Sequence, residues 1–282
     1  MENLSALQSG SQGHTEGWKW LRTRLESGES VIGLGITTAN LETAVLGAEL
    51  GFDFLWVEME HAPVSLEALR GIVLATRSLG VSVFARVPVV GLWTAKRVLD
   101  QGVSGVVFPF VSDPESARIA ALSCRYPPAG LRGSGAGLAA STSPERNNYY
   151  DYADANVLTV CVIEDKQALG NIDEIAAVPG IDVLFIGTSD LSFSLGFRGR
   201  RNESVLNGAI QTIIAAARRH NKFLGCPANS AEEVLRYREQ GFQLFHLATE
   251  LELMRLGARQ LLQPLSPDGS VADKRRPQIA GN

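Results

Sequence analysis

Several side chains capable of catalysis follow shortly after apolar segments of the sequence. Glu60 and His61 follow one such segment, and Arg86, Glu164 and Asp190 each follow another. The segments have the length and composition of buried β-strands and span residues 52–57, 81–85, 157–163 and 183–186. A polar residue gains no packing energy at the end of an apolar strand, whereas α/β barrels build their active sites at the carboxyl ends of their strands. The pattern therefore indicates an enzyme.

The two acids Glu164 and Asp190 have the chemistry of a metal site. They end neighbouring predicted strands, so both carboxylates would lie on one face of a barrel, where oxygen ligands suit Mg²⁺ or Mn²⁺. An isolated acid at a strand end more often caps a helix, but the presence of Arg86 and His61 on the same rim favours a metal site. The turn at residues 187–192 could add backbone N–H groups for a substrate carboxylate, or be an ordinary capped turn.

His61 and Arg86 have the chemistry of a general base and of an electrostatic stabiliser. Histidine titrates near neutral pH and can accept a proton from a substrate. The guanidinium of Arg86 could polarise a carbonyl or hold a developing enolate, or it could form a salt bridge with one of the acids. His246 lies inside the last predicted strand, and we interpret it as a core residue rather than a ligand.

Eight apolar segments, each followed by a helical pattern, would position these residues. The predicted strands span residues 31–36, 52–57, 81–87, 103–111, 157–163, 182–186, 223–227 and 243–248. The helical patterns span 40–50, from 65, 93–101, from 114, 167–177, 204–220, 231–240 and 250–262. Apolar strands alternating with helices predict a parallel sheet covered on both faces and, for eight units, a single (β/α)₈ TIM barrel.

A doubly wound open sheet is the alternative fold, and its nucleotide fingerprint is missing after the first strand. The Gly-rich stretch 133–140 follows a helix and a Pro-Pro turn instead of a strand, so it fails the context test for dinucleotide binding. Residues 125–156 form the longest irregular stretch, and we expect a functional loop there. We predict a disordered extension at 1–15, the catalytic barrel at 16–263 and a polar tail at 264–282.

The composition argues against several other classes of protein. The formal net charge is −4, and no arginine-rich stretch offers a surface for nucleic acid. No apolar segment approaches the roughly 20 residues of a membrane span, and the first residues lack an apolar signal core. The three cysteines are far apart, as is typical of proteins in a reducing compartment. We therefore expect a cytoplasmic protein that binds neither nucleic acid nor a membrane.

Several motifs together resemble the HpcH/HpaI aldolase/citrate lyase family, and within it the metal-dependent class II pyruvate aldolases that act on 2-keto-3-deoxy sugar acids. The resemblance covers roughly residues 31–262 and rests on the stretches GFDFLWVEMEHAP, ARVP, KRVLDQGVSGVVFPFV, RYPPAGLRGSG and VIEDKQALGNIDEIAAVPGIDVLFIGTSDLSFSLG. It implies a (β/α)₈ barrel and a homo-oligomer, commonly a hexamer built as a trimer of dimers that exchange C-terminal helices. It also implies a carbon–carbon lyase that cleaves a 4-hydroxy-2-oxo acid to pyruvate and an aldehyde through a metal-stabilised enolate.

The resemblance also implies which residues bind the metal and the 2-oxo acid. Glu164 and Asp190 would be the ligands of Mg²⁺ or Mn²⁺, with Co²⁺ as a further option. Arg86 would hold the pyruvyl oxygen, and the amides of Ser189 and Asp190, in the turn begun by Gly187, would bind the substrate carboxylate. The only lysines near the rim, at 96 and 166, fall in helical or loop positions, which favours the metal route over a Schiff base.

The remaining roles concern proton transfer. His61 would belong to the base machinery, and Asp100 matches a family acid that can orient the histidine across a subunit boundary. Glu58 stands where family members usually have Asp, which alters the support of His61 by one methylene. Val162 stands where a Gln is common, two residues before the metal-binding Glu164.

These departures leave other activities open. One is oxaloacetate decarboxylation or enolate attack on another acceptor, which product analysis would separate from aldol cleavage. Another is a coenzyme A-ester lyase, for which the sequence shows no distinct basic site to hold the nucleotide. The last is a catalytically silent relative kept for binding or assembly, which would fail to bind Mg²⁺ or Mn²⁺.

Overall fold

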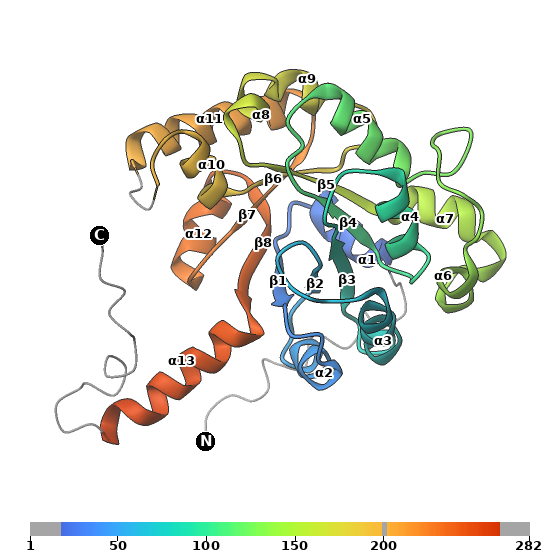
Figure 1. Ribbon diagram of the computed structural model, residues 1–282, viewed down its shortest axis with the longest axis horizontal. Coiled ribbons are helices and arrows are strands. Elements are labelled where there is room, and N and C mark those ends of the chain that lie inside the picture. The colour runs from blue at the N-terminus through green and yellow to red at the C-terminus, as the bar shows by residue number, and fades with distance from the viewer. Residues whose placement is uncertain (1–17, 199–201, 266–282) are drawn as a thin grey trace.

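A computed structural model describes residues 18–198 and 202–265, and its strands form one closed parallel barrel (Figure 1). The strands are β1 (Val31–Ile36), β2 (Phe54–Glu58), β3 (Ser82–Arg86), β4 (Gly105–Phe108), β5 (Leu158–Ile163), β6 (Val183–Ile186), β7 (Phe223–Pro227) and β8 (Phe242–Thr249). Each strand pairs with the next, and β8 pairs with β1. The predicted (β/α)₈ barrel is therefore confirmed, and the open sheet is excluded because an open sheet has two edge strands, whereas each of these eight strands pairs on both sides.

Helices cover the outside of the barrel (Figure 1). They are α1 (Trp18–Glu26), α2 (Leu41–Glu49), α3 (Leu66–Thr76), α4 (Leu92–Leu99), α5 (Pro114–Ser123), α6 (Gly137–Thr142), α7 (Tyr149–Asn156), α8 (Lys166–Gly170), α9 (Ile172–Ala177), α10 (Thr188–Ser194), α11 (Glu203–Arg219), α12 (Ala231–Glu239) and α13 (Glu250–Leu262). Short 3₁₀ helices span Arg146–Asn148 and Gln263–Leu265. None of the described helices is both long and apolar enough to cross a membrane.

Side-chain caps start several of the helices where the sequence changes from loop to helical pattern. Asn40, where the predicted helical pattern 40–50 begins, accepts a hydrogen bond from the amide of Thr43, 3.1 Å away, and caps α2. Asp113 and Ser116 form a reciprocal capping box ahead of Pro114, the first residue of α5. Such caps satisfy amide groups that the helix itself leaves unpaired, so they fix where each helix begins.

Large aromatic residues and glycines together fill the interior of the barrel in its amino-terminal half. The rings of Phe54 and Phe84 stack with their centroids 4.8 Å apart. Gly33 and Gly105 leave the space for these rings, because a Cβ at either position would collide with one of them. Close packing of this kind closes the amino-terminal half of the barrel and leaves the carboxyl ends of the strands for polar residues.

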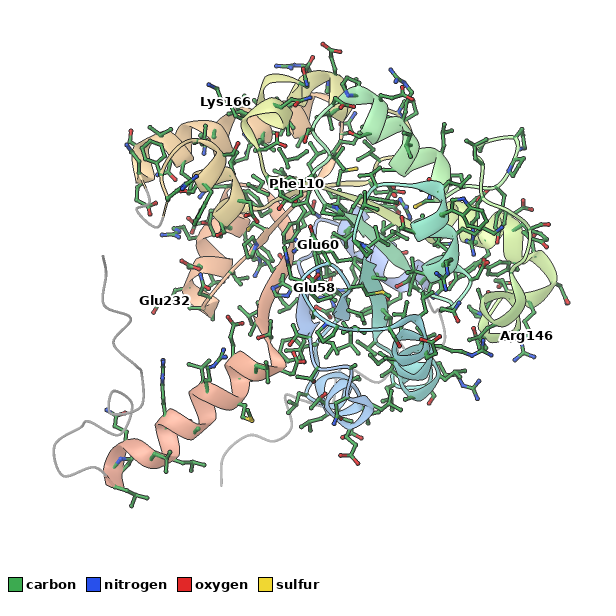
Figure 2. The ribbon with its side chains drawn as sticks, viewed as in Figure 1. Glu58, Glu60, Phe110, Arg146, Lys166 and Glu232 are labelled. Carbon is green, nitrogen blue, oxygen red and sulfur yellow. The ribbon has the colours of Figure 1, made fainter. Side chains whose placement is uncertain are left out.

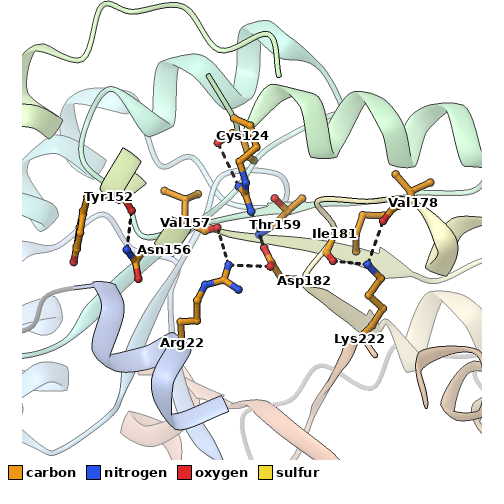
Figure 3. Close-up of polar contacts among 11 residues, drawn as sticks. Arg22, Cys124, Tyr152, Asn156, Val157, Thr159, Val178, Ile181, Asp182 and Lys222 are labelled. Atoms are coloured by element: carbon orange, nitrogen blue, oxygen red, sulfur yellow. Dashed lines mark hydrogen bonds and ion pairs between the residues drawn. The ribbon is translucent and has the colours of Figure 1, made fainter. Parts of the chain in front are cut away.

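Helix α1 closes the bottom of the barrel and was not predicted from the sequence. Its Leu21 and Leu25 are buried in the same apolar cluster as the side chains inside the barrel. Arg22 forms an ion pair of 2.8 Å with Asp182, which precedes β6, and also donates to the carbonyl of Val157 (Figure 3). Asp182 accepts from the amide of Thr159 in addition. These contacts join α1 to the loops that enter β5 and β6.

Other differences from the sequence-based expectations are local. The stretch 125–156, expected to be irregular, contains α6, α7 and a 3₁₀ turn, because short helical segments there pack beside the barrel. The predicted helix 167–177 is divided into α8 and α9 at Asn171. Strand β2 extends to Glu58, one residue beyond the prediction. The predicted extension 1–15 and most of the tail 264–282 lie outside the described residues, so those domain boundaries stay predictions.

Candidate active site

A cavity of about 330 Å³ opens at the carboxyl ends of the strands. Its walls include Glu58 from β2, Arg86 from β3, Glu164 after β5 and Asp190 from α10. Ser189 and Gly187, predicted to bind the substrate carboxylate, line the same cavity. The structure thus brings together six of the residues that the sequence analysis selected.

Glu164 is the buried acid of the cavity. The amide of Phe110 donates a hydrogen bond of 2.8 Å to its Oε1. The pKa of Glu164 is raised to about 7, mainly by burial, and the negative charges of Asp190 and Glu60 contribute to this increase. The Phe110 amide and the charge of Arg86 act in the opposite direction. A carboxyl group in this environment gains from a cation that neutralises the surrounding negative charge.

The backbone at Phe110 explains how its amide reaches Glu164. Phe110 follows β4 and has a φ of 47°, in the left-handed region that a residue with a side chain seldom adopts. The sequence contains no glycine at this position to indicate such a turn. Figure 2 labels Phe110, Glu58 and Glu60 with their side chains drawn as sticks. Strained backbone of this kind is typical of functional sites, because the surrounding structure must hold it in place.

Arg86 is held by Glu58, the last residue of β2, and by Glu60, two residues later. Its guanidinium pairs with Glu60 and lies 3.4 Å from Oε2 of Glu58. The side chain of Arg86 is largely buried, so solvent screens these charges weakly. The predicted rim salt bridge of Arg86 is therefore present, and the same guanidinium also lines the cavity.

Glu58 also shapes the segment that carries His61. Its Oε1 accepts hydrogen bonds from the amides of Glu60 at 2.8 Å and His61 at 3.0 Å. The longer side chain at position 58 thus reaches the backbone of the loop while its other oxygen faces Arg86. The sequence analysis selected Glu60, together with His61, as a side chain capable of catalysis but gave it no role; the structure shows that it pairs with Arg86.

His61 and Asp100 do not line the cavity of the single chain. The side chain of His61 is 63% exposed, and its Nε2 lies 3.6 Å from Oε2 of Glu60. Asp100 ends α4, and its Oδ1 lies 3.6 Å from the buried guanidinium of Arg132. Burial raises the pKa of Asp100, and the charge of Arg132 opposes that shift.

His246 is not a core residue, contrary to the sequence-based interpretation. Its ring is half-buried and lines the cavity, with Trp56 edge-on at a centroid distance of 5.4 Å. Alternation from Leu244, which is buried inside the barrel, places His246 on the inward face of β8, and at this carboxyl end of the strand that face borders the cavity instead of the core.

The described residues hold no cluster of three His, Cys, Asp or Glu side chains fit to bind a metal. Glu164 and Asp190 are instead a pair of carboxylates on one cavity wall, and hard divalent cations commonly take one or two protein carboxylates and keep water in other positions. The donor set therefore fits Mg²⁺ or Mn²⁺. No lysine is among the described residues that line the cavity.

Comparison with known proteins shows the family of this chain. The family model of HpcH/HpaI aldolase/citrate lyase matches residues 33–255. The chain belongs to this family. The predicted resemblance is confirmed, and the protein is a carbon–carbon lyase of an aldolase family.

Relatives of the HpcH/HpaI family match nearly the whole barrel. The chain is 34% identical over 234 residues to a 2-dehydro-3,6-dideoxy-6-sulfogluconate aldolase of Pseudomonas putida, covering 83% of this chain and 92% of that protein. It is 33% identical over 261 residues to a hydroxypyruvate/pyruvate aldolase of Cupriavidus necator, covering 90% of this chain and 96% of that protein. A solved structure of a family protein from Burkholderia cenocepacia has a TM-score of 0.81 and 30% identity, covering 87% of this chain and 98% of that one.

Proposed function

We propose that this HpcH/HpaI family member cleaves a 4-hydroxy-2-oxo acid to pyruvate and an aldehyde, using a divalent metal ion held by Glu164 and Asp190. The observation that carries the proposal is the shared cavity, in which two carboxylates, the guanidinium of Arg86 and the first turn of α10 face one space. Family membership supports the reaction class, and the lining residues support the metal-dependent route over an imine.

The metal proposed is Mg²⁺ or Mn²⁺, with Co²⁺ as a further option, because the two ligands offered are carboxylates. When bound, such an ion supplies a Lewis acid for the 2-oxo group and offsets the negative charge that develops there. Glu164 must be ionised to bind it, and because its pKa is raised, a proton and the cation compete for this side chain.

Arg86 and the start of α10 would orient the 2-oxo acid. Arg86 presents its positive charge to the 2-oxo oxygen, and its pairing with Glu58 and Glu60 keeps the guanidinium in a fixed position. The amides of Ser189 and Asp190 would bind the carboxylate of the substrate. Gly187 precedes them and leaves space beside Glu164.

His61 would accept the proton of the 4-hydroxyl group, directly or through a water molecule, as the C3–C4 bond breaks. Asp100 would orient His61 from a neighbouring subunit. The exposure of His61 and the position of Asp100 at the end of α4 support an arrangement in which a second copy completes the proton-transfer machinery.

A homo-oligomer, as a hexamer built from three dimers, is the proposed assembly. Helix α13 extends away from the barrel (Figure 1), and none of its residues is buried. Its apolar side chains Met254, Leu256 and Leu261 are 65%, 55% and 75% exposed, which supports burial against another subunit. A cytoplasmic location is proposed as well, supported by three buried cysteines that are free thiols.

Pyruvate release from a panel of 4-hydroxy-2-oxo acids tests the proposed function. We expect release that requires added Mn²⁺ and that is lost in Glu164→Ala. The matched control is Glu174→Ala, an exposed acid of α9, which should keep the wild-type rate. Carbon dioxide released from oxaloacetate without cleavage of the panel would indicate a decarboxylase. Protein that neither cleaves substrate nor binds Mn²⁺ would contradict the proposal and indicate a silent relative.

A further inference from the structure

His246 contributes an imidazole to the wall of the cavity. The residue belongs to β8, and its register partners are Gly33 in β1 and Pro227 in β7. Thr249, three residues later, pairs with Gly35 and lines the cavity too. The bulge between these pairs lets both side chains face the same space, which regular alternation would prevent.

Gly35 provides the space that the ring of His246 occupies. A Cβ at position 35 would lie 2.5 Å from Nε2 and 3.1 Å from Cε1 of His246. Such separations are far below van der Waals contact, so the ring can hold this position only beside a glycine. Trp56 lies on another side with its ring at 76° to the imidazole. The ring is therefore confined by two neighbouring strands.

The imidazole of His246 is suited to hydrogen bonding as a neutral group. Burial lowers its pKa, and the charge of Arg86 acts in the same direction, whereas Glu252 and Glu58 oppose the shift. A neutral imidazole has one nitrogen that donates and one that accepts. A hydrogen bond with the backbone of residue 246 also opposes the shift, and no side chain of the described residues forms a hydrogen bond with this ring, so a molecule in the cavity could use the remaining nitrogen.

The position of His246 separates it from the metal pair. Glu164 and Asp190 come from the carboxyl ends of β5 and β6, whereas His246 comes from β8, which lies beyond β7 and adjoins β1. Thr37, Asn229 and Glu233 also line the cavity; the hydroxyl of Thr37 donates to Glu250, and the amide of Asn229 donates to Glu233. A substrate bound by its 2-oxo acid end at β5 and β6 would extend its other half toward β8.

We propose that His246 is a specificity-determining residue that hydrogen-bonds a hydroxyl or oxo group on the aldehyde half of the substrate. The favoured aldehydes are then hydroxylated, and alkyl aldehydes of the same size are disfavoured. The inference rests on the proposed aldolase function. It goes beyond that function in assigning a residue of β8, apart from the metal pair, that contacts the aldehyde half of the substrate.

Aldol addition of pyruvate to two acceptors of equal size tests the inference. Glycolaldehyde carries a hydroxyl group where propionaldehyde carries a methyl group. The ratio of their kcat/KM values does not depend on the fraction of active enzyme, so it compares variants directly. We expect His246→Leu to lower the glycolaldehyde preference about tenfold, the value of one hydrogen bond. Gly35→Ala should lower it similarly by displacing the ring, and the double variant should show no further loss.

The control is Val234→Ala, which removes a buried side chain of α12 outside the cavity and should leave the ratio at its wild-type value. Metal-dependent exchange of the pyruvate methyl protons with solvent deuterium, measured on the wild-type protein, reports the proposed function separately. Exchange together with an unchanged ratio in His246→Leu would overturn the role of His246 alone. Wild-type protein without exchange and without adducts would overturn both the function and this inference.

Discussion

Gly187 lies directly against the carboxylate of Glu164. A Cβ on residue 187 would stand 2.6 Å from Oε2 and 2.7 Å from Cβ of Glu164. Gly187 follows β6 and Glu164 follows β5, two strands paired in register from Val160 to Ile163 with Val183 to Ile186. The missing side chain at 187 therefore decides whether the acid of the neighbouring strand can face the cavity.

Gly187→Ala should weaken metal binding because the added methyl displaces the carboxylate of Glu164. We expect the dissociation constant for Mn²⁺, measured by titration calorimetry, to rise about tenfold or more, within the range seen when the surroundings of a metal ligand are disturbed. Gly170→Ala is the matched control, since a Cβ there meets nothing within 4 Å. Equal Mn²⁺ affinity in Gly187→Ala and wild type would show that Glu164 is not a ligand.

The stability of the metal-free protein should fall as the pH rises through the titration of Glu164. The pKa of Glu164 is about 7 in the folded chain against an ordinary 4.5, so the folded state binds more protons between these values. This difference in pKa, about 2.5, lowers the free energy of unfolding by about 3 kcal/mol at high pH. The loss is complete above the pKa of the folded chain and absent below the pKa of the unfolded chain.

Glu164→Gln should remove this pH dependence. In urea denaturation with a chelator, we expect the variant to exceed the wild type in stability near pH 8 and to match it more closely near pH 5. Glu174→Gln should follow the wild-type curve, because this residue is exposed on α9. A constant difference between Glu164→Gln and wild type across this pH range would contradict the raised pKa.

Asp182→Asn should destabilise the bottom of the barrel. Asp182 pairs with Arg22 at 2.8 Å and Arg125 at 3.2 Å, and accepts from the amide of Thr159 (Figure 3). The neutral amide leaves two largely buried guanidinium groups without a counter-charge, so we expect a loss of about 2 to 4 kcal/mol in the free energy of unfolding.

Asp173→Asn is the control for Asp182→Asn. Asp173 also pairs with a cation, Arg219, but both side chains are more than half exposed. Exposed pairs contribute little, so its free energy of unfolding should change by less than about 1 kcal/mol. Equal effects of the two substitutions in chemical denaturation would show that α1 is not held through Asp182.

Charged substitutions on α13 should reduce the size of the assembly. Leu256→Glu with Leu261→Glu places two carboxylates among apolar side chains that we propose are covered by another subunit, and light scattering should then detect a smaller species. The control is Leu235→Glu on α12, 56% exposed and separate from α13. An unchanged mass in the α13 double variant would exclude this helix from the interface.

The sequence by itself determined the barrel and most of the metal side of the cavity. Apolar runs long enough for buried strands, separated by capped helical patterns, leave few ways to bury both faces of a parallel sheet. Reactive residues at the strand ends then fall on one rim, which is why Glu164, Asp190 and Arg86 could be selected from spacing alone. Both inferences need only local periodicity and the direction of the strands.

Only the tertiary structure decided the contacts made across the barrel. The amide of Phe110 meets Glu164 through a left-handed backbone, and Glu60 reaches Arg86 from another strand. His246 faces the cavity where Gly35 of β1 leaves room for its ring, and the bulge that follows it in β8 brings Thr249 to the same face. Each contact joins residues far apart in the sequence, and its geometry depends on closure and register, which no local pattern of residue types encodes.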